Sequence, residues 1–226
     1  MSKTNVQIVQ EYIEQVINQE HLERIFDYCA EDCVFHIPPY VGLGLNFDDR
    51  SGDKIVLTDI APNSPAAGNL RAGDEVVRVT DGAKTWESFK DLKSGLWGSG
   101  VIGTPITVTV NRDGTLMNIP LKRGRVDAFD MVLSTSIDQW KDFTLRYWPD
   151  LHMEIKIIFG EGDQVACYTI NSGTQQEYHR SAVWAEMGIY HVRDGKIAES
   201  WGVEDIFSQM RQVGYQINEP VTEQPA

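Results

Sequence analysis

Three residues in this sequence have side chains suited to moving protons near neutral pH. They are His36, Glu204 and Asp205. An imidazole or a carboxyl group close to a reacting atom can act as a general acid or base, which contributes roughly 10²–10⁴-fold in rate. Each residue also has a simpler interpretation, because half-buried histidines and solvated carboxylates are common. Where the helices and strands place these residues distinguishes the catalytic interpretation from the structural one.

A β-hairpin over residues 184–205 is expected to position the two carboxylates. Asp194-Gly195 stands between two runs of alternating residues, which is the strongest short hairpin signal. If these two residues form the turn, Ile189 faces Ser200 and Met187 faces Gly202. Glu204 and Asp205 then fall where the second strand gives way to a helix.

The two faces of this hairpin differ, because successive side chains of a strand point to opposite sides. One predicted face is apolar or small and suits a cavity; it carries Met187, Ile189, Ser200 and Gly202. The other face is larger and more polar; it carries Glu186, Tyr190, Glu199 and Trp201. Large aromatic side chains are costly to expose, so the second face predicts a homodimer interface through Tyr190 and Trp201.

The N-terminal and central elements should complete the same domain. Thr4 with Gln7 resembles a capping box at the start of a helix, and residues 33–37 read as a strand that carries His36. Ser136 is expected to cap a second helix, which ends before Pro149. The tail from Asn218 is rich in Pro and Glu and predicts disorder.

Two segments carry a family resemblance. GIYHVRDGKIAESWGVEDIFSQMRQVG, residues 188–214, resembles the closing strands and last helix of the SnoaL-like polyketide and ester cyclases, and YWPDLHMEI, residues 147–155, resembles their helix-to-strand junction. The resemblance implies an α+β, cone-shaped fold of the nuclear-transport-factor-two superfamily, with a curved antiparallel sheet and helices. It also implies that His36 lies near the cavity.

The same resemblance places the family's catalytic motif on the last strand. The family carries His-Trp-Asp there, and the Asp transfers protons at an acidic C–H of a polyketide. The matching residues here are Ser200-Trp201-Gly202, so the proton-transfer carboxylate is replaced by glycine. Cyclase activity is therefore in doubt unless another group, His36 or Asp205, supplies the base.

Residues 40–126 interrupt this pattern and have another one. Ser64-Pro65-Ala66-Ala67 and Leu70-Arg71-Ala72-Gly73-Asp74 precede a helix expected over residues 86–96 and a hairpin around Asp113-Gly114. The segment resembles a PDZ domain, a small β-barrel with helices, of the kind found in bacterial C-terminal processing proteases. Neither a Ser-Lys nor a Ser-His-Asp arrangement is present, so proteolysis does not carry over.

The PDZ resemblance implies that a peptide binds beside its first strand. Glycines in the loop allow backbone amides to converge on a carboxylate, and the strand after them offers an unpaired edge. The expected peptide-binding residues are Gly42, Leu43, Gly44, Leu45, Phe47 and Phe89. The expected domains are residues 1–39 plus 127–217, residues 40–126, and a tail at 218–226.

Charge and cysteine content limit the partners. The net charge is −13, and residues 40–126 hold 11 Lys and Arg against 10 Asp and Glu, whereas the remainder holds 9 against 23. An acidic body argues against nucleic acid. No run of about 20 apolar residues predicts a membrane span. Three cysteines without a zinc pattern indicate a reducing cytoplasm and no metal or other cofactor.

Three functional interpretations follow. The first is a binding protein that joins a small-molecule pocket to a peptide-recognising PDZ domain. The second is a cyclase or isomerase with a relocated base, His36 or Asp205. The third is a scaffold whose host domain dimerises and presents two PDZ grooves. Because the catalytic position is lost while the PDZ loop is present, the first and third are favoured together, with a role that is non-catalytic or weakly catalytic.

Overall fold

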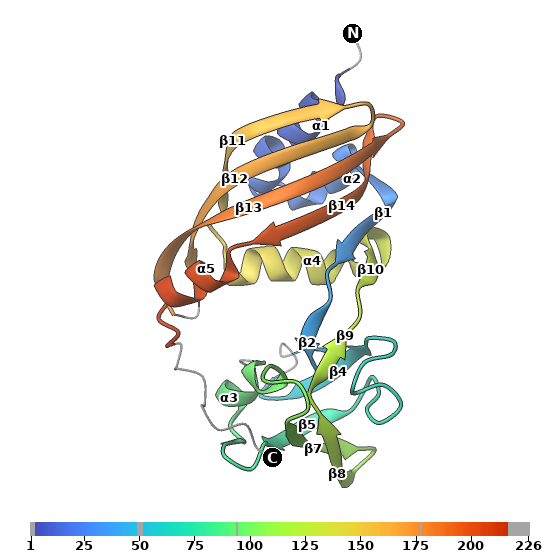
Figure 1. Cartoon of the computed structure of the whole chain (residues 1–226), viewed down its shortest axis with the longest axis vertical. Helices are drawn as coiled ribbons and strands as arrows, with labels where there is room; N and C mark the ends of the chain where they lie inside the picture. The colour runs from blue at the N-terminus through green and yellow to red at the C-terminus, as the bar shows by residue number, and fades with distance from the viewer. Residues whose placement is uncertain (1–2, 49–51, 94, 177, 217–226) are drawn as a thin grey trace. The chain divides into compact units, whose positions relative to one another are not determined.

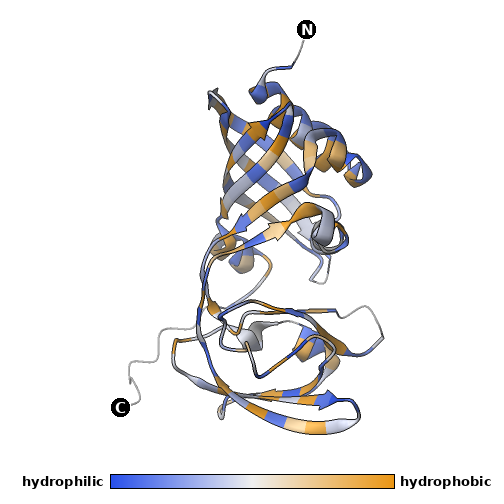
Figure 2. Ribbon diagram, turned by 90° about the vertical axis from the view of Figure 1, so that its right-hand side faces the viewer, coloured by the Kyte–Doolittle hydropathy of each residue, from blue (hydrophilic) through white to orange (hydrophobic). Residues whose placement is uncertain are grey.

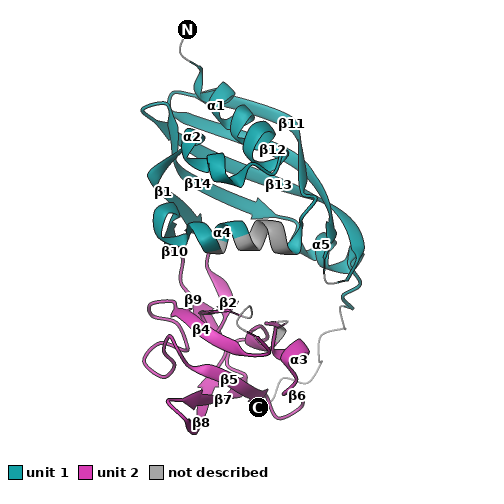
Figure 3. Cartoon of the chain, turned by 180° about the vertical axis from the view of Figure 1, so that it is seen from behind, with its two compact units in different colours: residues 1–37, 130–226 teal, residues 38–129 magenta. Residues whose placement is uncertain are grey.

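The computed structural model describes residues 3–48, 52–93, 95–176 and 178–216. The chain divides into two compact units, residues 1–37 with 130–226 and residues 38–129 (Figure 3). We call them unit 1 and unit 2. The expected tail at 218–226 lies outside the described residues. None of the described helices has both the length and the apolar character that a membrane span requires.

Unit 1 is built on one large sheet with helices against it (Figure 1). Its strands run in the order β10-β1-β14-β13-β12-β11, and β1 pairs in parallel with β14. Their bounds are β1 Cys29–Ile37, β10 Phe129–Val132, β11 His152–Glu161, β12 Gln164–Gln175, β13 Arg180–Arg193 and β14 Lys196–Glu204. The helices are α1 Asn5–Glu11, η1 Tyr12–Ile17, η2 Leu22–Arg24, α2 Ile25–Tyr28, α4 Leu133–Tyr147 and α5 Ile206–Gln212.

The N-terminal helices cover one face of this sheet. The capping box is confirmed, since the Gln7 N–H donates to Thr4 Oγ1 at 3.2 Å and the Gln7 side chain accepts from the Thr4 N–H at 2.9 Å. Ile13 and Val16 are fully buried against strand residues such as Val165. Polar and apolar residues alternate along the strands (Figure 2), so only one face of the sheet joins the core. We call that face the inner face and the opposite one the outer face.

The second predicted helix of this unit begins earlier than expected. Helix α4 starts at Leu133, which is fully buried, so Ser136 lies inside the helix and not at its cap. The helix ends at Tyr147, before Pro149, because the residue preceding a proline disfavours the helical conformation.

Unit 2 contains an open sheet in the order β3-β4-β5-β7-β8, with β6 paired to β5, and a small sheet of β2 with β9. The bounds are β2 Tyr40–Gly42, β3 Leu45–Asp48, β4 Ile55–Ile60, β5 Glu75–Thr80, β6 Thr85–Trp86, β7 Pro105–Arg112, β8 Thr115–Lys122 and β9 Gly124–Val126. Helices are α3 Phe89–Lys93 and η3 Leu96–Gly98. Within the described ranges β3 and β8 are the free ends of the larger sheet, so this sheet is curved but open and does not close into a complete barrel.

The helix predicted over residues 86–96 is also shorter than expected. Trp86 belongs to strand β6, and α3 begins only at Phe89. Ser88 caps it, because the Asp91 N–H donates to Ser88 Oγ at 3.2 Å. Gly95, with a φ of +66°, then ends the helical turn.

Candidate functional site

The closing hairpin of unit 1 has the predicted turn but not the predicted register. Asp194 and Gly195 have φ values of 53° and 75°, as a two-residue turn requires. Arg193 faces Lys196, but a β-bulge at Ala198 shifts the later pairs, so Tyr190 faces Ser200 and Ile189 faces Trp201. The extra residue is visible in burial, since Ile197 and Ala198 are both buried although they are neighbours.

This one-residue shift changes which side chains share a face. Met187 and Ile189 were expected in a pocket, but they are 52% and 44% exposed on the outer face with Trp201. Tyr190 was expected at a dimer interface, but it is buried in the inner-face core. Ser200 and Gly202 remain on the inner face, opposite Tyr190 and Gly188. Of the hairpin residues expected to line a pocket, Met187 and Ile189 thus lie on one face and Ser200 and Gly202 on the other.

A polar cluster lies on the inner face beside Gly202. Asn171 Nδ2 donates to Glu186 Oε2 at 2.6 Å, and Thr169 Oγ1 donates to Asn171 Oδ1 at 2.7 Å, which orients the amide. Trp184 Nε1 donates to Glu204 Oε2 at 3.0 Å. These five residues come from β12, β13 and β14, and we call them the Glu186 cluster.

The two carboxyl groups of this cluster have perturbed acidity. Burial, and to a smaller extent the charge of Glu204, raise the pKa of Glu186 to about 7 against the opposing hydrogen bond from Asn171. Burial also raises the pKa of Glu204, against the hydrogen bond from Trp184. Carboxyl groups that stay protonated near neutral pH occur preferentially at functional sites.

Gly202, next to the cluster, leaves room on the inner face, whereas Gly188 opposite it is covered. A Cβ atom on Gly202 would meet only Glu186 Oε1, at 3.7 Å, and the backbone oxygen of Met187, at 3.9 Å. Across the hairpin, the Tyr190 ring lies over Gly188, with its hydroxyl oxygen 2.9 Å from where a Cβ would stand. The space in front of position 202 is therefore bounded by the Glu186 carboxyl group.

His36 lies elsewhere, on the outer face of β1. Its ring stacks on Trp201 with centroids 4.3 Å apart, and its Nδ1 and Nε2 lie 2.8 Å from Asp130 Oδ1 and 2.9 Å from Glu199 Oε2. Burial alone would lower the pKa of His36, but the hydrogen bonds to Glu199 and Asp130 outweigh it and raise the pKa. His36 was expected near a cavity; in the structure its ring packs against Trp201 on the outer face.

The two carboxylates proposed at the strand end have different roles. Asp205 caps α5, because its Oδ1 accepts from the Ser208 N–H at 2.9 Å. Glu204 points to the inner face and belongs to the Glu186 cluster. Of the sequence-derived candidates, only Glu204 and Gly202 therefore meet at one place, together with Glu186, which the predicted register had assigned to the other face.

In unit 2 the backbone of the loop over residues 42–45 requires glycine at position 44. Gly44 has a φ of +74°, and a Cβ atom there would overlap the Ser64 side chain. The Gly44 carbonyl accepts from the Ala61 N–H at 2.8 Å, and the Leu43 carbonyl accepts from the Ala66 N–H at 3.0 Å. Leu43 is buried, so its side chain supports the loop from the core. Gly42 pairs with Gly124 in the small sheet.

The register of β3 leaves one backbone position free for a partner. Leu45 is paired with Ile60, and the neighbouring Ala61 N–H donates to the Gly44 carbonyl. In an antiparallel ladder such bonds flank a non-hydrogen-bonded pair. The N–H and C=O groups of Leu45 therefore point away from β4. Phe47 lies beside this edge, with its ring 3.5 Å from the Cβ position of Gly95 and 6.3 Å from the Trp97 ring.

Comparisons with known families agree with both geometries. The model of the SnoaL-like polyketide cyclases matches residues 133–213, and the PDZ model matches residues 41–122. The chain carries a SnoaL-like domain and a PDZ domain. We therefore call unit 1 the SnoaL-like unit and unit 2 the PDZ unit. No curated protein matches the chain.

Solved structures with similar folds include three proteins from Streptomyces. Wild-type IdmH from Streptomyces antibioticus is 16% identical with a TM-score of 0.47, and the match covers 94% of this chain and 100% of that chain. TsrD from Streptomyces laurentii is 12% identical with a TM-score of 0.44, covering 95% and 98%. AclR from Streptomyces galilaeus is 23% identical with a TM-score of 0.36, covering 41% and 62%.

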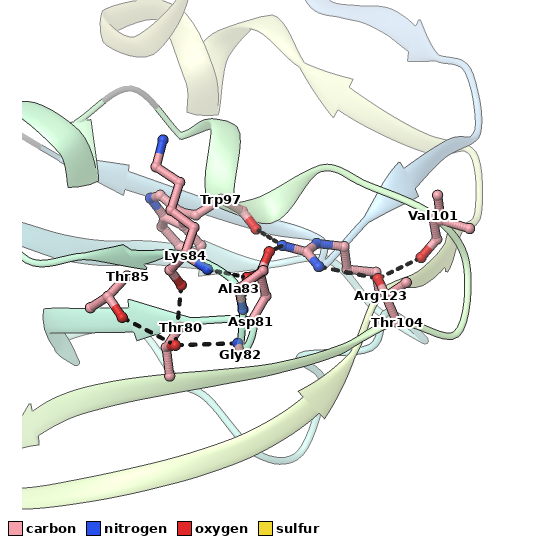
Figure 4. A network of polar contacts seen from close by, with 10 residues as sticks. All are labelled: Thr80, Asp81, Gly82, Ala83, Lys84, Thr85, Trp97, Val101, Thr104 and Arg123. Carbon is pink, nitrogen blue, oxygen red and sulfur yellow. Dashed lines mark hydrogen bonds and ion pairs between the residues drawn. The ribbon is translucent and has the colours of Figure 1, made fainter. Parts of the chain in front are cut away.

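In the PDZ unit the buried Arg123 hydrogen-bonds to several segments of the chain. The sequence analysis did not identify this residue. Arg123 is 5% exposed; its Nη2 donates to the Trp97 carbonyl at 2.9 Å and to Asp81 Oδ2 at 3.3 Å, and its Nη1 donates to Thr104 Oγ1 at 3.1 Å (Figure 4). Burial would raise the pKa of Asp81, but the N–H groups of Lys84 and Ala83 and the Arg123 guanidinium lower it. The network joins three loops to the end of β8.

Proposed function

We propose that the protein is a peptide-binding adaptor, whose PDZ unit captures the C-terminus of a partner protein while its SnoaL-like unit holds a small molecule. The observation that carries the proposal is the outward-facing backbone of Leu45 on edge strand β3. An extended peptide can add to such an edge through main-chain hydrogen bonds. Phe47 and Phe89 are half-buried and supply apolar contacts for alternate peptide side chains.

Peptides with a free, apolar C-terminus should bind the full chain, and the same peptides with an amidated C-terminus should bind at least tenfold more weakly. Hydrogen bonds to a charged group contribute about 1.5–3 kcal/mol, which is roughly 10–100-fold in affinity. Fluorescence titration of labelled peptide pairs measures the ratio. Equal affinity within each pair would remove carboxylate capture by the Gly42–Leu45 loop.

The chain's own C-terminus is one candidate peptide, although residues 217–226 lie outside the described residues. A tethered tail has an effective concentration in the millimolar range if its linker can span the gap. A chain truncated after Glu219 should then bind external peptides more tightly than the full chain in the same titration. Equal affinity of the two forms contradicts capture of the tail and leaves peptide binding intact.

Within the SnoaL-like unit we propose pairing of two copies through the outer face. The supporting observation is an exposed apolar belt on β11, β13 and β14, with exposures of 38% to 64%. Its members are Ile157, Phe159, Met187, Ile189, Trp201 and Val203. Apolar patches of this kind mark interaction sites.

Val203→Lys is expected to weaken this pairing, because it places a charge in the belt at a position that is 64% exposed in one copy. Sedimentation velocity at micromolar concentration should show more monomer for this variant than for the natural chain. Val101→Lys, at a residue of the PDZ unit that is 73% exposed, is the matched control and should not change the distribution. A monomeric natural chain would contradict the pairing.

A further inference from the structure

Two polar side chains on the inner face of the SnoaL-like unit, the buried Tyr190 and the half-buried Glu186, each have an oxygen without a partner among the described residues. Tyr190 is only 8% exposed, and none of the described residues hydrogen-bonds its hydroxyl group. Glu186 Oε2 is held by Asn171, but Oε1 accepts no hydrogen bond from any described residue. Neither atom is among the fully buried polar atoms without a partner, which in the described residues are Asn111 Oδ1 and Arg123 Nε. Both oxygens can therefore be reached by water or by a ligand that enters on this face.

The two groups are brought together by the glycine pair. The Tyr190 hydroxyl lies against Gly188, and Glu186 Oε1 lies against the neighbouring face of Gly202. Gly188 and Gly202 are directly opposite each other in the β13–β14 ladder, where Cβ positions are about 5 Å apart. The Glu186 carboxyl group therefore borders the open side of Gly202, and the Tyr190 ring covers Gly188 on the opposite strand.

We propose that Glu186 is the proton-transfer residue of the SnoaL-like unit and that the Tyr190 hydroxyl stabilises the oxygen on which negative charge develops. The substrate class is an uncharged carbonyl compound with an acidic C–H group. This assignment rests on the proposal that the SnoaL-like unit holds a small molecule. It places the carboxyl group on β13, facing the position on β14 where glycine has replaced the expected acid.

The step balances without any further reactant. Glu186 Oε1 takes the proton from the carbon next to the carbonyl, and the C–H electron pair forms the C=C bond of an enolate. The carbonyl oxygen gains the charge and accepts a hydrogen bond from Tyr190, as in other preorganised oxyanion sites. The Glu186 acid then returns the proton to another atom of the same molecule, which completes an isomerisation.

The orientation of the Glu186 carboxyl group and the acidities of Glu186 and Tyr190 both suit proton transfer. The chain from Thr169 through Asn171 to Glu186 Oε2 leaves Oε1 as the free, oriented oxygen. Glu186, with its pKa raised to about 7, is a stronger base than an ordinary carboxylate and still ionises at neutral pH. Burial raises the pKa of Tyr190 far above its usual range, so the phenol remains a donor.

The surroundings also restrict the ligand. The titratable groups that interact with Glu186 are Glu204 on β14, Tyr190 on β13, Cys167 on β12 and Tyr12 on η1. Glu204 adds a second carboxyl group, so an anionic ligand would be repelled. A neutral, planar molecule meets no such cost and can contact the aromatic rings of Tyr12 and Tyr190, which lie edge-on to each other.

The test uses the full chain and 5-nitrobenzisoxazole, an uncharged carbon acid. Loss of its ring proton to a base breaks the N–O bond and releases a coloured cyanophenolate. Glu186→Gln should lower the rate of cyanophenolate release by roughly 10²–10⁴-fold, and Tyr190→Phe should lower this rate less. Glu154→Gln, the same change at an exposed position of β11, is the control and should leave the rate unchanged. Circular dichroism confirms that each variant is folded.

The pH profile distinguishes a base from a merely structural carboxyl group. The rate should rise through a midpoint near the Glu186 pKa of about 7, and Glu204→Gln should move that midpoint to lower pH, because the charge of Glu204 raises the Glu186 pKa. Turnover that is equal in the natural chain and in Glu186→Gln overturns the assignment. Equilibrium dialysis of the probe separates the two proposals: binding without Glu186-dependent turnover overturns proton transfer alone, whereas absence of binding counts against both.

Discussion

The SnoaL-like unit should lose about 3 kcal/mol of stability as the pH rises from about 4.5 to about 7, and Glu186→Gln should remove most of that loss. The pKa of Glu186 rises from 4.5 to about 7 on folding. Below 4.5 the carboxyl group is protonated in both states and costs nothing. Between the two values the unfolded chain releases its proton first, so unfolding becomes more favourable as the pH rises.

The direction of this effect separates Glu186 from the other acids of the unit. Carboxyl groups whose pKa is lowered on folding, such as Glu199 and Asp150, lose their stabilising contribution when the pH falls, not when it rises. His36 and His191 have raised pKa values, so their contribution is lost only as the pH rises above about 6.5. The interval between about pH 5 and about pH 6 therefore reports mainly on Glu186 and its partner Glu204.

Hydrogen exchange along a urea series measures the effect, because amides of β13 report the SnoaL-like unit separately. The free energy of unfolding is compared at about pH 5 and about pH 6 for the natural chain and for Glu186→Gln, below the range in which the histidines contribute. Glu154→Gln should keep the pH dependence of the natural chain. Above pH 7 the Glu186→Gln variant should be the more stable protein. A natural chain as stable at the higher pH as at the lower one would contradict the burial of this carboxyl group.

Arg123→Met should destabilise the PDZ unit by about 3 kcal/mol, which corresponds to roughly 10–20 °C in its melting temperature. Methionine preserves much of the apolar stem but none of the donors. The Trp97 carbonyl, Thr104 Oγ1 and Asp81 then lose a partner in a region that is largely closed to water. Asp81 keeps the N–H groups of Ala83 and Lys84, so we expect the lower end of the range for a broken buried ion pair.

Calorimetry of the full chain should show this loss in one of two transitions, since we propose that residues 40–126 and residues 1–39 with 127–217 fold as separate domains. Arg125→Met is the matched control, two residues further along the chain. Arg125 forms an exposed ion pair with Asp127, and such pairs contribute about 0–1 kcal/mol. A single transition that both variants leave unchanged would contradict the role of Arg123 and the independence of the two domains.

The local elements of this chain were largely determined by its sequence. Asp194-Gly195 and Asp113-Gly114 both form turns, because residues with positive φ are required there and the flanking segments alternate. Thr4 and Gln7 start α1 as expected. The two segments that resemble the cyclases, residues 147–155 and 188–214, lie on the strands and helices that they predict. These features depend on residues close together in the chain, so they can be read without the fold.

The site was decided by the tertiary structure. One bulge residue, Ala198, exchanged the faces of the hairpin, so Met187 and Ile189 point to the outer face and Glu186 points to the inner one. Two buried neighbours in an alternating strand, Ile197 and Ala198, were the only local sign of it. Because a strand has a period of two, a single inserted residue reverses every later side chain. Whether that residue pairs or bulges depends on how β14 packs between β13 and β1, and β1 is distant in sequence.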